Sequence, residues 1–350
     1  MKYFRLAGSR VVKTGIAIFI TAWICILLEW PPVFAVITAI VTIEPTVSDS
    51  IKKGIIRFPA SAIGSAYAVL FISLFGNSPL TYTLAAVFTI ATCFRLKLHA
   101  GLLVATLTSV AMVEVIHTNV LMSFFIRLGT TTTGLVVSTV VNMFMLPPEY
   151  TKEITKRLET IAFRSGIAVE RVFQDILDDQ HQIIVVEQEL TERLDKMIRQ
   201  TEQLIRFQEE ESKYHPLVGS EQTQFRQDQK QLVQLRLINY HIENLVYTLF
   251  DTAEWPPEER TDIMNAVTAL AQSLKRPDAY DRNKHREQFN RLTEIFWDDT
   301  EVITTAKKQH PAALPPELKV LYELLSIYNL VEKYFERGWD KNIESKNNPN

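Results

Sequence analysis

Long runs of apolar residues fill the first 148 positions of the chain. A helix that crosses a bilayer needs about 20 consecutive, mostly apolar residues. Six segments are candidates: Val11–Leu28, Pro32–Ile43, Phe58–Phe75, Leu80–Phe94, Ala100–Ile116 and Val120–Leu146. The first follows a basic stretch but is long for a signal-peptide core and is followed by further apolar segments. We therefore predict an integral membrane domain of six transmembrane helices over residues 1–148.

From Glu149 onward the pattern changes, and apolar residues recur every three or four positions. This spacing is typical of amphipathic helices in a soluble domain. The clearest series are Ile154, Leu158, Ile161, Ser165, Ala168 and Val172; Leu232, Leu235, Asn239, Ile242, Val246 and Leu249; and Leu321, Leu324, Tyr328, Val331 and Phe335. Breaks are expected near Asp178–Gln182, Tyr214–Gly219, Trp255–Pro257, Arg276–Tyr280 and His310–Pro316. The sequence predicts five or six helices in a C-terminal bundle over residues 149–340, and a flexible tail at 341–350.

The charge distribution supports this division and indicates an orientation. Residues 1–148 hold 10 Lys and Arg and 4 Asp and Glu, whereas the remainder holds 27 and 36. Basic residues precede the first apolar segment and follow the second, fourth and sixth, but the other connections contain none. Short cytoplasmic loops are enriched in Lys and Arg. We therefore expect a multi-pass protein of the plasma membrane, with both termini and the acidic helical domain in the cytoplasm.

An internal repeat runs through the membrane half, with a constant offset between its two copies. Equivalent positions carry the same residue in both copies: Thr38 and Thr108, Glu44 and Glu114, Arg57 and Arg127, and Gly64 and Gly134. Each copy contains three predicted helices, so the second copy would enter the membrane from the opposite side. Inverted repeats are typical of secondary transporters, which bind substrate near the middle of the membrane.

Arg127 is the clearest candidate functional residue, since it lies inside the sixth apolar segment. Ionisable groups within the bilayer are costly and often mark a substrate or ion pathway. Glu114 is its expected partner. A structural ion pair, or a side chain that reaches the membrane surface, is the alternative interpretation. Arg57 and Glu44 are the equivalent residues of the first copy, where Arg57 also counts among the basic residues of a cytoplasmic loop.

The segment Ile43-Glu44-Pro45-Thr46 indicates a broken helix. The preceding apolar segment is short, and Pro45 lacks a backbone donor, so carbonyl groups would be left unpaired. Such backbone is tolerated at membrane depth where it lines a cavity. A loop at the membrane surface is the other possibility. We expect Glu44, Pro45 and Thr46 to line a substrate or ion pathway.

Small and polar residues of the sixth segment complete the candidate set. Thr130 and Thr131 are candidates for the pathway or for close helix packing. Gly64 and Gly134 are expected to allow close approach between helices. Asn142 is expected to form a hydrogen bond between helices.

Several functional classes find no support in the sequence. The two cysteines, Cys25 and Cys93, lie in apolar runs, and the seven histidines show no metal-ligand spacing. No phosphate-binding glycine motif is present. The acidic C-terminal half carries no basic stripe for nucleic acid. We therefore predict no metal, no cofactor, no nucleic-acid partner and no enzymatic activity.

Two stretches resemble the signatures of the aromatic acid exporter and fusaric acid resistance superfamily. They are Val36-Ile37-Thr38-Ala39-Ile40 with Glu44-Pro45-Thr46, Lys52-Lys53-Gly54, Arg57 and Gly64, and Arg127-Leu128-Gly129-Thr130 with Gly134 and Val141-Asn142. The layout resembles the bacterial branch with a helical C-terminal domain. The resemblance implies transport of organic anions. It also implies a homo-oligomer, since larger members carry twice as many membrane helices. Glu44 departs from the family, in which Gln is commoner at this position.

These observations favour a proton-coupled exporter of small organic compounds, aromatic or carboxylated, that works within the lipid bilayer. Arg127 and Arg57 would attract the substrate anion, and Glu44 or Glu114 would exchange protons. An organic-anion channel is the first alternative, because plant relatives in the superfamily act as anion channels. A membrane-anchored interaction protein that acts through its helical domain is the second.

Overall fold

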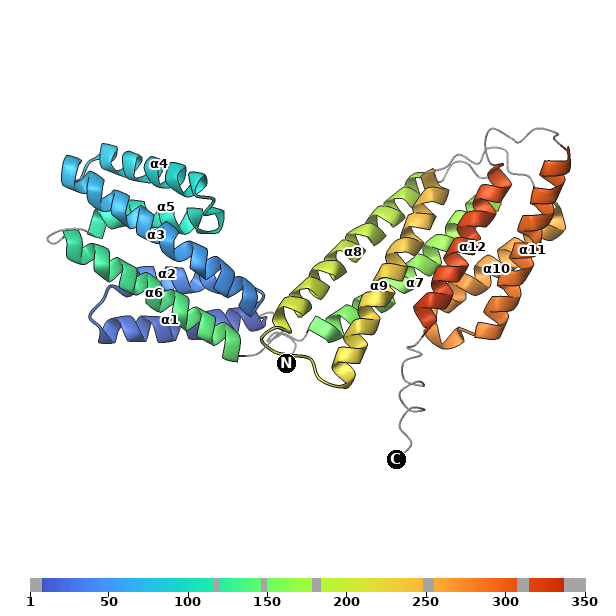
Figure 1. Cartoon of the computed structure of the whole chain (residues 1–350), viewed down its shortest axis with the longest axis horizontal. Helices are drawn as coiled ribbons and strands as arrows, with labels where there is room; N and C mark the ends of the chain where they lie inside the picture. The colour runs from blue at the N-terminus through green and yellow to red at the C-terminus, as the bar shows by residue number, and fades with distance from the viewer. Residues whose placement is uncertain are drawn as a thin grey trace, which may run out of the picture. The chain divides into compact units, whose positions relative to one another are not determined.

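The computed structural model describes residues 8–115, 120–145, 150–177, 184–247, 255–306 and 315–336. These residues form helices and their connections, and no strand occurs among them (Figure 1). The chain divides into two units. The first comprises Met1–Glu149 and Phe207–Pro216, and the second comprises Tyr150–Arg206 and Leu217–Asn350. The inclusion of Phe207–Pro216 in the first unit was not foreseen from the sequence.

The described residues of the N-terminal part of the first unit form six α-helices and one short 3₁₀ helix. They are α1 (Ser9–Leu27), α2 (Pro32–Thr42), α3 (Val47–Phe75), α4 (Pro79–Arg95), η2 (His99–Gly101), α5 (Leu102–Val115) and α6 (Val120–Phe144). Within the described residues, three stretches are long and apolar enough to cross a membrane: Arg10–Leu27, Val47–Phe75 and Leu121–Phe144. Pro32–Thr42 and His99–Glu114 are shorter apolar helices. The 11 residues of α2 rise only about 16 Å, roughly half the thickness of the hydrocarbon core.

The third helix begins earlier than the sequence pattern predicts. We expected it at Phe58, after a basic loop, but α3 starts at Val47 and contains Lys52, Lys53 and Arg57. The Thr46 side chain caps this helix by accepting a hydrogen bond from the backbone N–H of Asp49 at 3.1 Å. The helix therefore starts at a favourable capping residue, and its first turns accommodate the basic side chains that a loop was expected to carry.

The helices of the two sequence repeats pack in matching pairs. α3 packs on α5, and α6 packs on α2; α1 packs on α2 and α6, and α4 packs on α5 and α3. In addition, α3 contacts α6. Replacing each helix by its equivalent in the other repeat (α1 by α4, α2 by α5, α3 by α6, and the reverse) converts each of the contacts just named into another of them, or into itself for α3 with α6. Equivalent segments of the two copies thus have equivalent neighbours (Figure 1).

Two glycines form the closest equivalent contacts in this packing. A Cβ atom built on Gly64 would lie 2.3 Å from the carbonyl oxygen of Ala105, and one on Gly134 would lie 2.4 Å from that of Ala35. These distances are far below a normal contact, so only glycine allows the backbones to approach this closely. Gly64 and Gly134 therefore occupy close contacts between helices.

The second unit contains α7 (Tyr150–Leu177), most of α8 (Ile184–Glu211), α9 (Ser220–Tyr247), α10 (Pro257–Lys275), η3 (Pro277–Ala279), α11 (Arg282–Ala306) and α12 (Pro316–Phe335). One cluster of buried apolar side chains draws on all six α-helices. All six residues of the predicted series on α7 are buried, as are Leu232, Leu235, Asn239 and Ile242 on α9 and Leu321, Leu324, Tyr328 and Val331 on α12. The expected break at Asp178–Gln182 and the tail at 341–350 lie outside the described residues.

Candidate functional site

The chain leaves helical geometry between α2 and α3, at Ile43–Thr46. The side chain of Asn142, on α6, holds this break from one side. Its Nδ2 donates hydrogen bonds to the main-chain oxygens of Glu44 at 3.1 Å and Thr46 at 3.3 Å, and to Ser50 Oγ at 2.8 Å. Asn142 is 1% exposed. It therefore satisfies backbone carbonyls that the break would otherwise leave unpaired, which extends the interhelical role expected from the sequence.

Glu44 lies in the break and pairs with two cations of α3. Its carboxylate contacts Arg57 Nη2 at 2.7 Å and Lys53 Nζ at 3.0 Å. The Arg57 and Glu44 side chains are 8% and 12% exposed, so this pair is largely shielded from solvent. Burial acts to raise the pKa of the Glu44 carboxyl, but hydrogen bonds from Arg57 and Lys53 outweigh it and hold this pKa below its ordinary value. The carboxyl group is thus held in its ionised form.

The end of α8 contributes two carboxylates to the first unit. Glu210 contacts Lys52 Nζ at 3.0 Å and accepts a hydrogen bond from Thr46 Oγ1 at 3.2 Å. Glu211 is 1% exposed and accepts from the backbone N–H of Val47 at 3.2 Å. Val47 is the first residue of α3, where the helix dipole favours a negative charge. Acidic groups outside the apolar helices therefore stabilise the start of α3.

Arg127 occupies the interior of the first unit and is 4% exposed. Its Nη2 donates to Thr108 Oγ1, and the guanidinium carbon lies 4.2 Å from the ring centre of Phe34. Among the described residues, Nε and Nη1 have no hydrogen-bond partner. Buried charges in proteins are normally paired, so a buried guanidinium with two unsatisfied nitrogens is unusual.

The expected pair between Arg127 and Glu114 is not formed. The Glu114 carboxylate instead accepts a hydrogen bond from the Tyr82 hydroxyl at 2.6 Å, and Glu114 is exposed. Closeness in the sequence did not predict this ion pair correctly. Glu114 lies on α5 at a position that faces α4, whereas the Arg127 side chain contacts Thr108 and Phe34. The two arginines of the repeat therefore differ in their partners.

A group of buried hydroxyls surrounds the Arg127 region. Ser61 Oγ lies 3.5 Å from Thr108 Oγ1 and 3.3 Å from Thr131 Oγ1. Thr130 and Thr131 each donate to the main-chain oxygen of Arg127 at 2.9 Å. Ser61 and Thr131 are themselves related by the repeat, so equivalent positions of the two copies meet at the contact of α3 with α6. This region combines a cation, hydroxyl groups and an aromatic ring.

The predicted site residues thus separate into two groups and one outlier. The break group comprises Glu44, Pro45, Thr46, Arg57 and Asn142, and the interior group comprises Arg127, Thr130 and Thr131. Glu114 belongs to neither. Sequence reasoning missed Phe34, Ser61 and the buried Lys13 as members of these groups. The repeat offset could have indicated Ser61 through Thr131, whereas Phe34 and Lys13 carry no sequence signal of their contacts.

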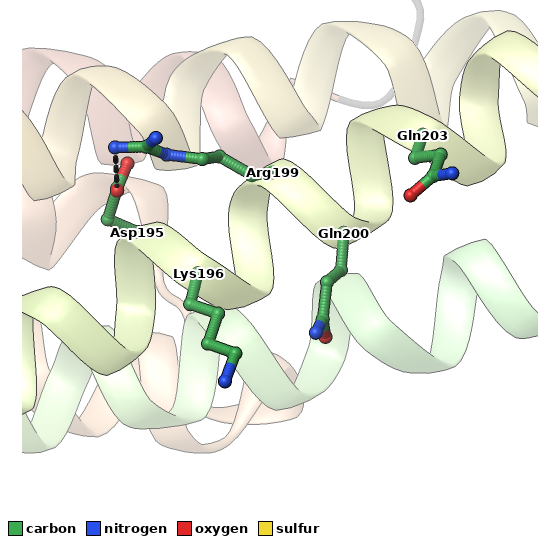
Figure 2. A pocket seen from close by; sticks show the side chains of 5 residues that line it. All are labelled: Asp195, Lys196, Arg199, Gln200 and Gln203. Atoms are coloured by element: carbon green, nitrogen blue, oxygen red, sulfur yellow. Dashed lines mark ion pairs between the residues drawn. The ribbon is translucent and has the colours of Figure 1, made fainter.

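The second unit contains a shallow groove along α8, with a volume of about 260 Å³. Figure 2 shows that its side chains follow one another along this single helix: Asp195, Lys196, Arg199, Gln200 and Gln203. Asp195 and Arg199 form an ion pair at 2.5 Å, one helical turn apart. In the part of the chain that the structure describes, no three His, Cys, Asp or Glu side chains are grouped to hold a metal ion. The groove therefore brings together no constellation of chemical groups from different elements.

Comparison with known proteins shows related sequences over nearly the whole chain. Residues 5–145 match the model of the family described as aromatic acid exporter family member 1. A UPF0421 protein of Oceanobacillus iheyensis is 51% identical over 337 residues, which cover 96% of this chain and 97% of that protein. A UPF0421 protein of Bacillus cereus is 39% identical over 95% of this chain and 94% of its own length. A UPF0421 protein of Staphylococcus haemolyticus is 34% identical over 95% of this chain and 98% of its own length.

Proposed function

The chain belongs to the UPF0421 protein family, and from that premise we propose that it is a proton-coupled exporter of small organic anions. The match of residues 5–145 to an aromatic acid exporter family supports a membrane exporter. Aromatic or other lipophilic carboxylates are the proposed substrates. The apolar helices of the first unit support a location in the membrane, and we propose the plasma membrane, with both termini in the cytoplasm.

The proposed transport domain consists of six membrane helices in two inverted three-helix repeats. The matching helix contacts and the equivalent glycine contacts at Gly64 and Gly134 support this arrangement. The short helix α2 and the break at Glu44–Thr46 fit the interrupted helices found at transport sites. Backbone of this kind is accepted within a membrane only where other protein groups satisfy it, as Asn142 does here.

The single observation that carries the proposal is the buried, incompletely paired guanidinium of Arg127. An organic anion that reached Arg127 would supply the hydrogen-bond acceptors that Nε and Nη1 lack. The ring of Phe34 and the hydroxyl of Thr108, on α2 and α5, already contact the same side chain. A cation, an aromatic face and a hydroxyl group together suit a carboxylate with an apolar body.

The proposal is tested by efflux from proteoliposomes that contain the full chain. Benzenesulfonate is a suitable probe, because its permanent charge prevents passage through the bilayer as a neutral acid. We expect efflux to depend on a pH difference, to be lost in Arg127→Met and to persist in Arg95→Met. Arg95 is an exposed cation at the end of α4 and serves as the matched control.

Three outcomes would contradict this proposal. Currents that reverse at the anion equilibrium potential, with no dependence on the pH difference, would identify an anion channel. Unchanged efflux in Arg127→Met would remove Arg127 from the pathway. If instead no flux of any organic anion occurs and residues 150–340 alone retain a binding partner, the chain acts through its helical domain.

A further inference from the structure

Helix α1 carries a buried lysine that the proposed transport path has not used. Lys13 is 4% exposed. Its Nζ donates to Asn142 Oδ1 at 2.8 Å and to the Asn142 main-chain oxygen at 3.3 Å. Both acceptors are neutral, and none of the described carboxylates forms an ion pair with Lys13. An ammonium group in such surroundings lacks the counter-charge that normally compensates burial.

Asn142 connects this ammonium to the break between α2 and α3. The same amide that accepts from Lys13 donates through Nδ2 to the main-chain oxygens of Glu44 and Thr46 and to Ser50 Oγ. Ser50 Oγ in turn donates to the Thr42 main-chain oxygen at 3.0 Å. Hydrogen bonds arranged in series polarise one another. The positive charge of an ammonium group bonded to Oδ1 of Asn142 therefore strengthens Nδ2 of the same amide as a donor. The charge of Lys13 therefore acts on the break through one side chain.

We propose that Lys13 is the proton-exchange residue of the transporter, and that its charge determines whether Asn142 holds the α2–α3 break. This inference rests on the proposed function, for which it supplies the proton-binding group. In the step, one Nζ–H bond of the ammonium breaks and the proton passes to water, while the electron pair stays on Nζ. The neutral amine retains two N–H donors, but the charge that strengthened the Asn142 contacts is gone.

The carboxylates suggested by the sequence are less suited to this role. Glu44 is held ionised by Arg57 and Lys53, and Glu114 is exposed and bonded to Tyr82. The pKa of a lysine shifts readily when its side chain is buried, which suits the residue to proton exchange. Its immediate contact, Asn142, cannot titrate and so transmits the charge without competing for the proton.

Among the residues that the structure describes, the charged groups near Lys13 come from few elements. On α1, Arg10 is exposed. Helix α2 has no titratable residue, and the contact from α6 is the neutral Asn142. Glu44, in the break, directs its carboxylate to α3. The remaining charge is Glu211, which acts on Lys13 from a distance while it bonds the Val47 N–H and His215. Glu211 therefore forms no direct ion pair with Lys13.

A thiol probe in the first turn of α3 can report whether the break is held. Ser48 is 3% exposed, and Ser48→Cys is nearly isosteric. In membrane vesicles, the cysteine is labelled with a water-soluble thiosulfonate from about pH 6 to about pH 10, the range over which buried and exposed lysines titrate. The labelling rate at each pH is divided by the labelling rate of the same chain after denaturation, which corrects for the titration of the thiol itself. The chain without Ser48→Cys gives the background labelling of the buried Cys25 and Cys93.

We expect labelling of the Lys13 chain to rise roughly tenfold along a single titration curve as the proton leaves. Lys13→Arg keeps its charge and should remain protected at every pH. Lys13→Met has no charge and should be labelled at the high-pH rate throughout. Labelling of Lys13→Arg that follows the same titration curve as the parent chain would overturn the proposal, even if Lys13→Met fails to fold.

The measurement needs no substrate, so its result is separate from that of the efflux experiment. Failure of the Lys13 proposal with normal benzenesulfonate efflux would leave the exporter function intact and place the proton elsewhere. If labelling of Ser48→Cys depends on pH through Lys13 but no anion flux occurs, the role of Lys13 at the α2–α3 break would stand and the exporter function would be contradicted.

Discussion

The two halves of the membrane unit share a helical framework but differ at their arginines. Arg57 and Arg127 occupy equivalent positions of the repeat, on helices α3 and α6. Arg57 contacts the Glu44 carboxylate and the Ala100 main-chain oxygen. Among the described residues, the guanidinium of Arg127 donates a hydrogen bond only to the Thr108 hydroxyl and lies over the Phe34 ring, and two of its nitrogens lack a hydrogen-bond partner. The same residue at equivalent positions thus forms an ion pair in one half and remains an uncompensated cation in the other.

The position of the acidic residue explains this difference. Glu44 follows the end of α2, where the break lets its side chain turn toward Arg57 and Lys53. Glu114 lies within the helix α5, and its carboxylate reaches Tyr82. A repeat therefore preserves the packing while the electrostatics diverge. We infer that the first half stabilises the fold at its arginine and that the second keeps its arginine available for an anion.

The largest expected difference is between Arg57→Met and Arg127→Met in unfolding by SDS in mixed micelles. Arg57→Met leaves the largely buried Glu44 carboxylate with Lys53 alone and should lower stability by about 3 kcal/mol, the scale for breaking a buried pair. Arg127→Met replaces an unpaired charge with an apolar side chain and should be neutral or stabilising. Equal losses in the two variants would contradict the comparison.

The glycine contacts test whether the packing is equivalent in the two halves. Gly64→Ala and Gly134→Ala would each force a helix backbone apart and should destabilise the unit by about 1–3 kcal/mol, by similar amounts. Gly54→Ala is the control, because its Cβ would meet only Leu135 Cδ2 at an ordinary 3.7 Å. It should be neutral or slightly stabilising in the same unfolding assay. A large loss in only one of the first two variants would show that the halves are not equivalent.

The pH dependence of stability should reflect the Glu44 pair. Because the pKa of this carboxyl is lower in the folded state than in the unfolded state, its contribution is complete above the unfolded value. The contribution is lost as pH falls through the folded value. Glu44→Gln should therefore flatten the acid limb of a plot of stability against pH. An unchanged acid limb would mean that the Arg57 contact does not stabilise the ionised form.

The smallest effect is expected at the outlying carboxylate. Tyr82→Phe removes the hydrogen bond to Glu114, which is exposed, so stability should change by no more than about 1 kcal/mol. Efflux of benzenesulfonate should be unaffected. Loss of efflux in Tyr82→Phe would return Glu114 to the pathway, as first expected from its position near Arg127 in the sequence.

Hydrophobic periodicity predicted much of the helical architecture, since burial dominates there. The series beginning at Ile154 is buried throughout, and the breaks before Ser220 and Pro257 occur where Gly and Pro interrupt the pattern. The predicted start of α3 was wrong because the three cations Lys52, Lys53 and Arg57 are typical of a loop, whereas the Thr46 cap initiates the helix before all of them. Local pattern alone does not reveal which polar residues a folded neighbour will satisfy.

The candidate site was predictable in its residue types but not in its pairings. Composition singled out Arg127 and Glu44, since charges are rare in apolar segments. The contacts of Arg127 with Phe34 and Thr108 depend on how α2, α5 and α6 pack, which is set over long sequence distances. The contact between Lys13 and Asn142 likewise depends on packing over a long sequence distance, because Lys13 lies on α1 and Asn142 lies on α6.

Anion binding at Arg127 is tested most directly by the thermal stability of the purified chain in the presence of benzenesulfonate. A ligand that binds the folded state alone raises the unfolding temperature with concentration. We expect such a rise in the unmodified chain and in Arg95→Met, and none in Arg127→Met. An equal rise in Arg127→Met would show that this buried guanidinium does not bind the anion.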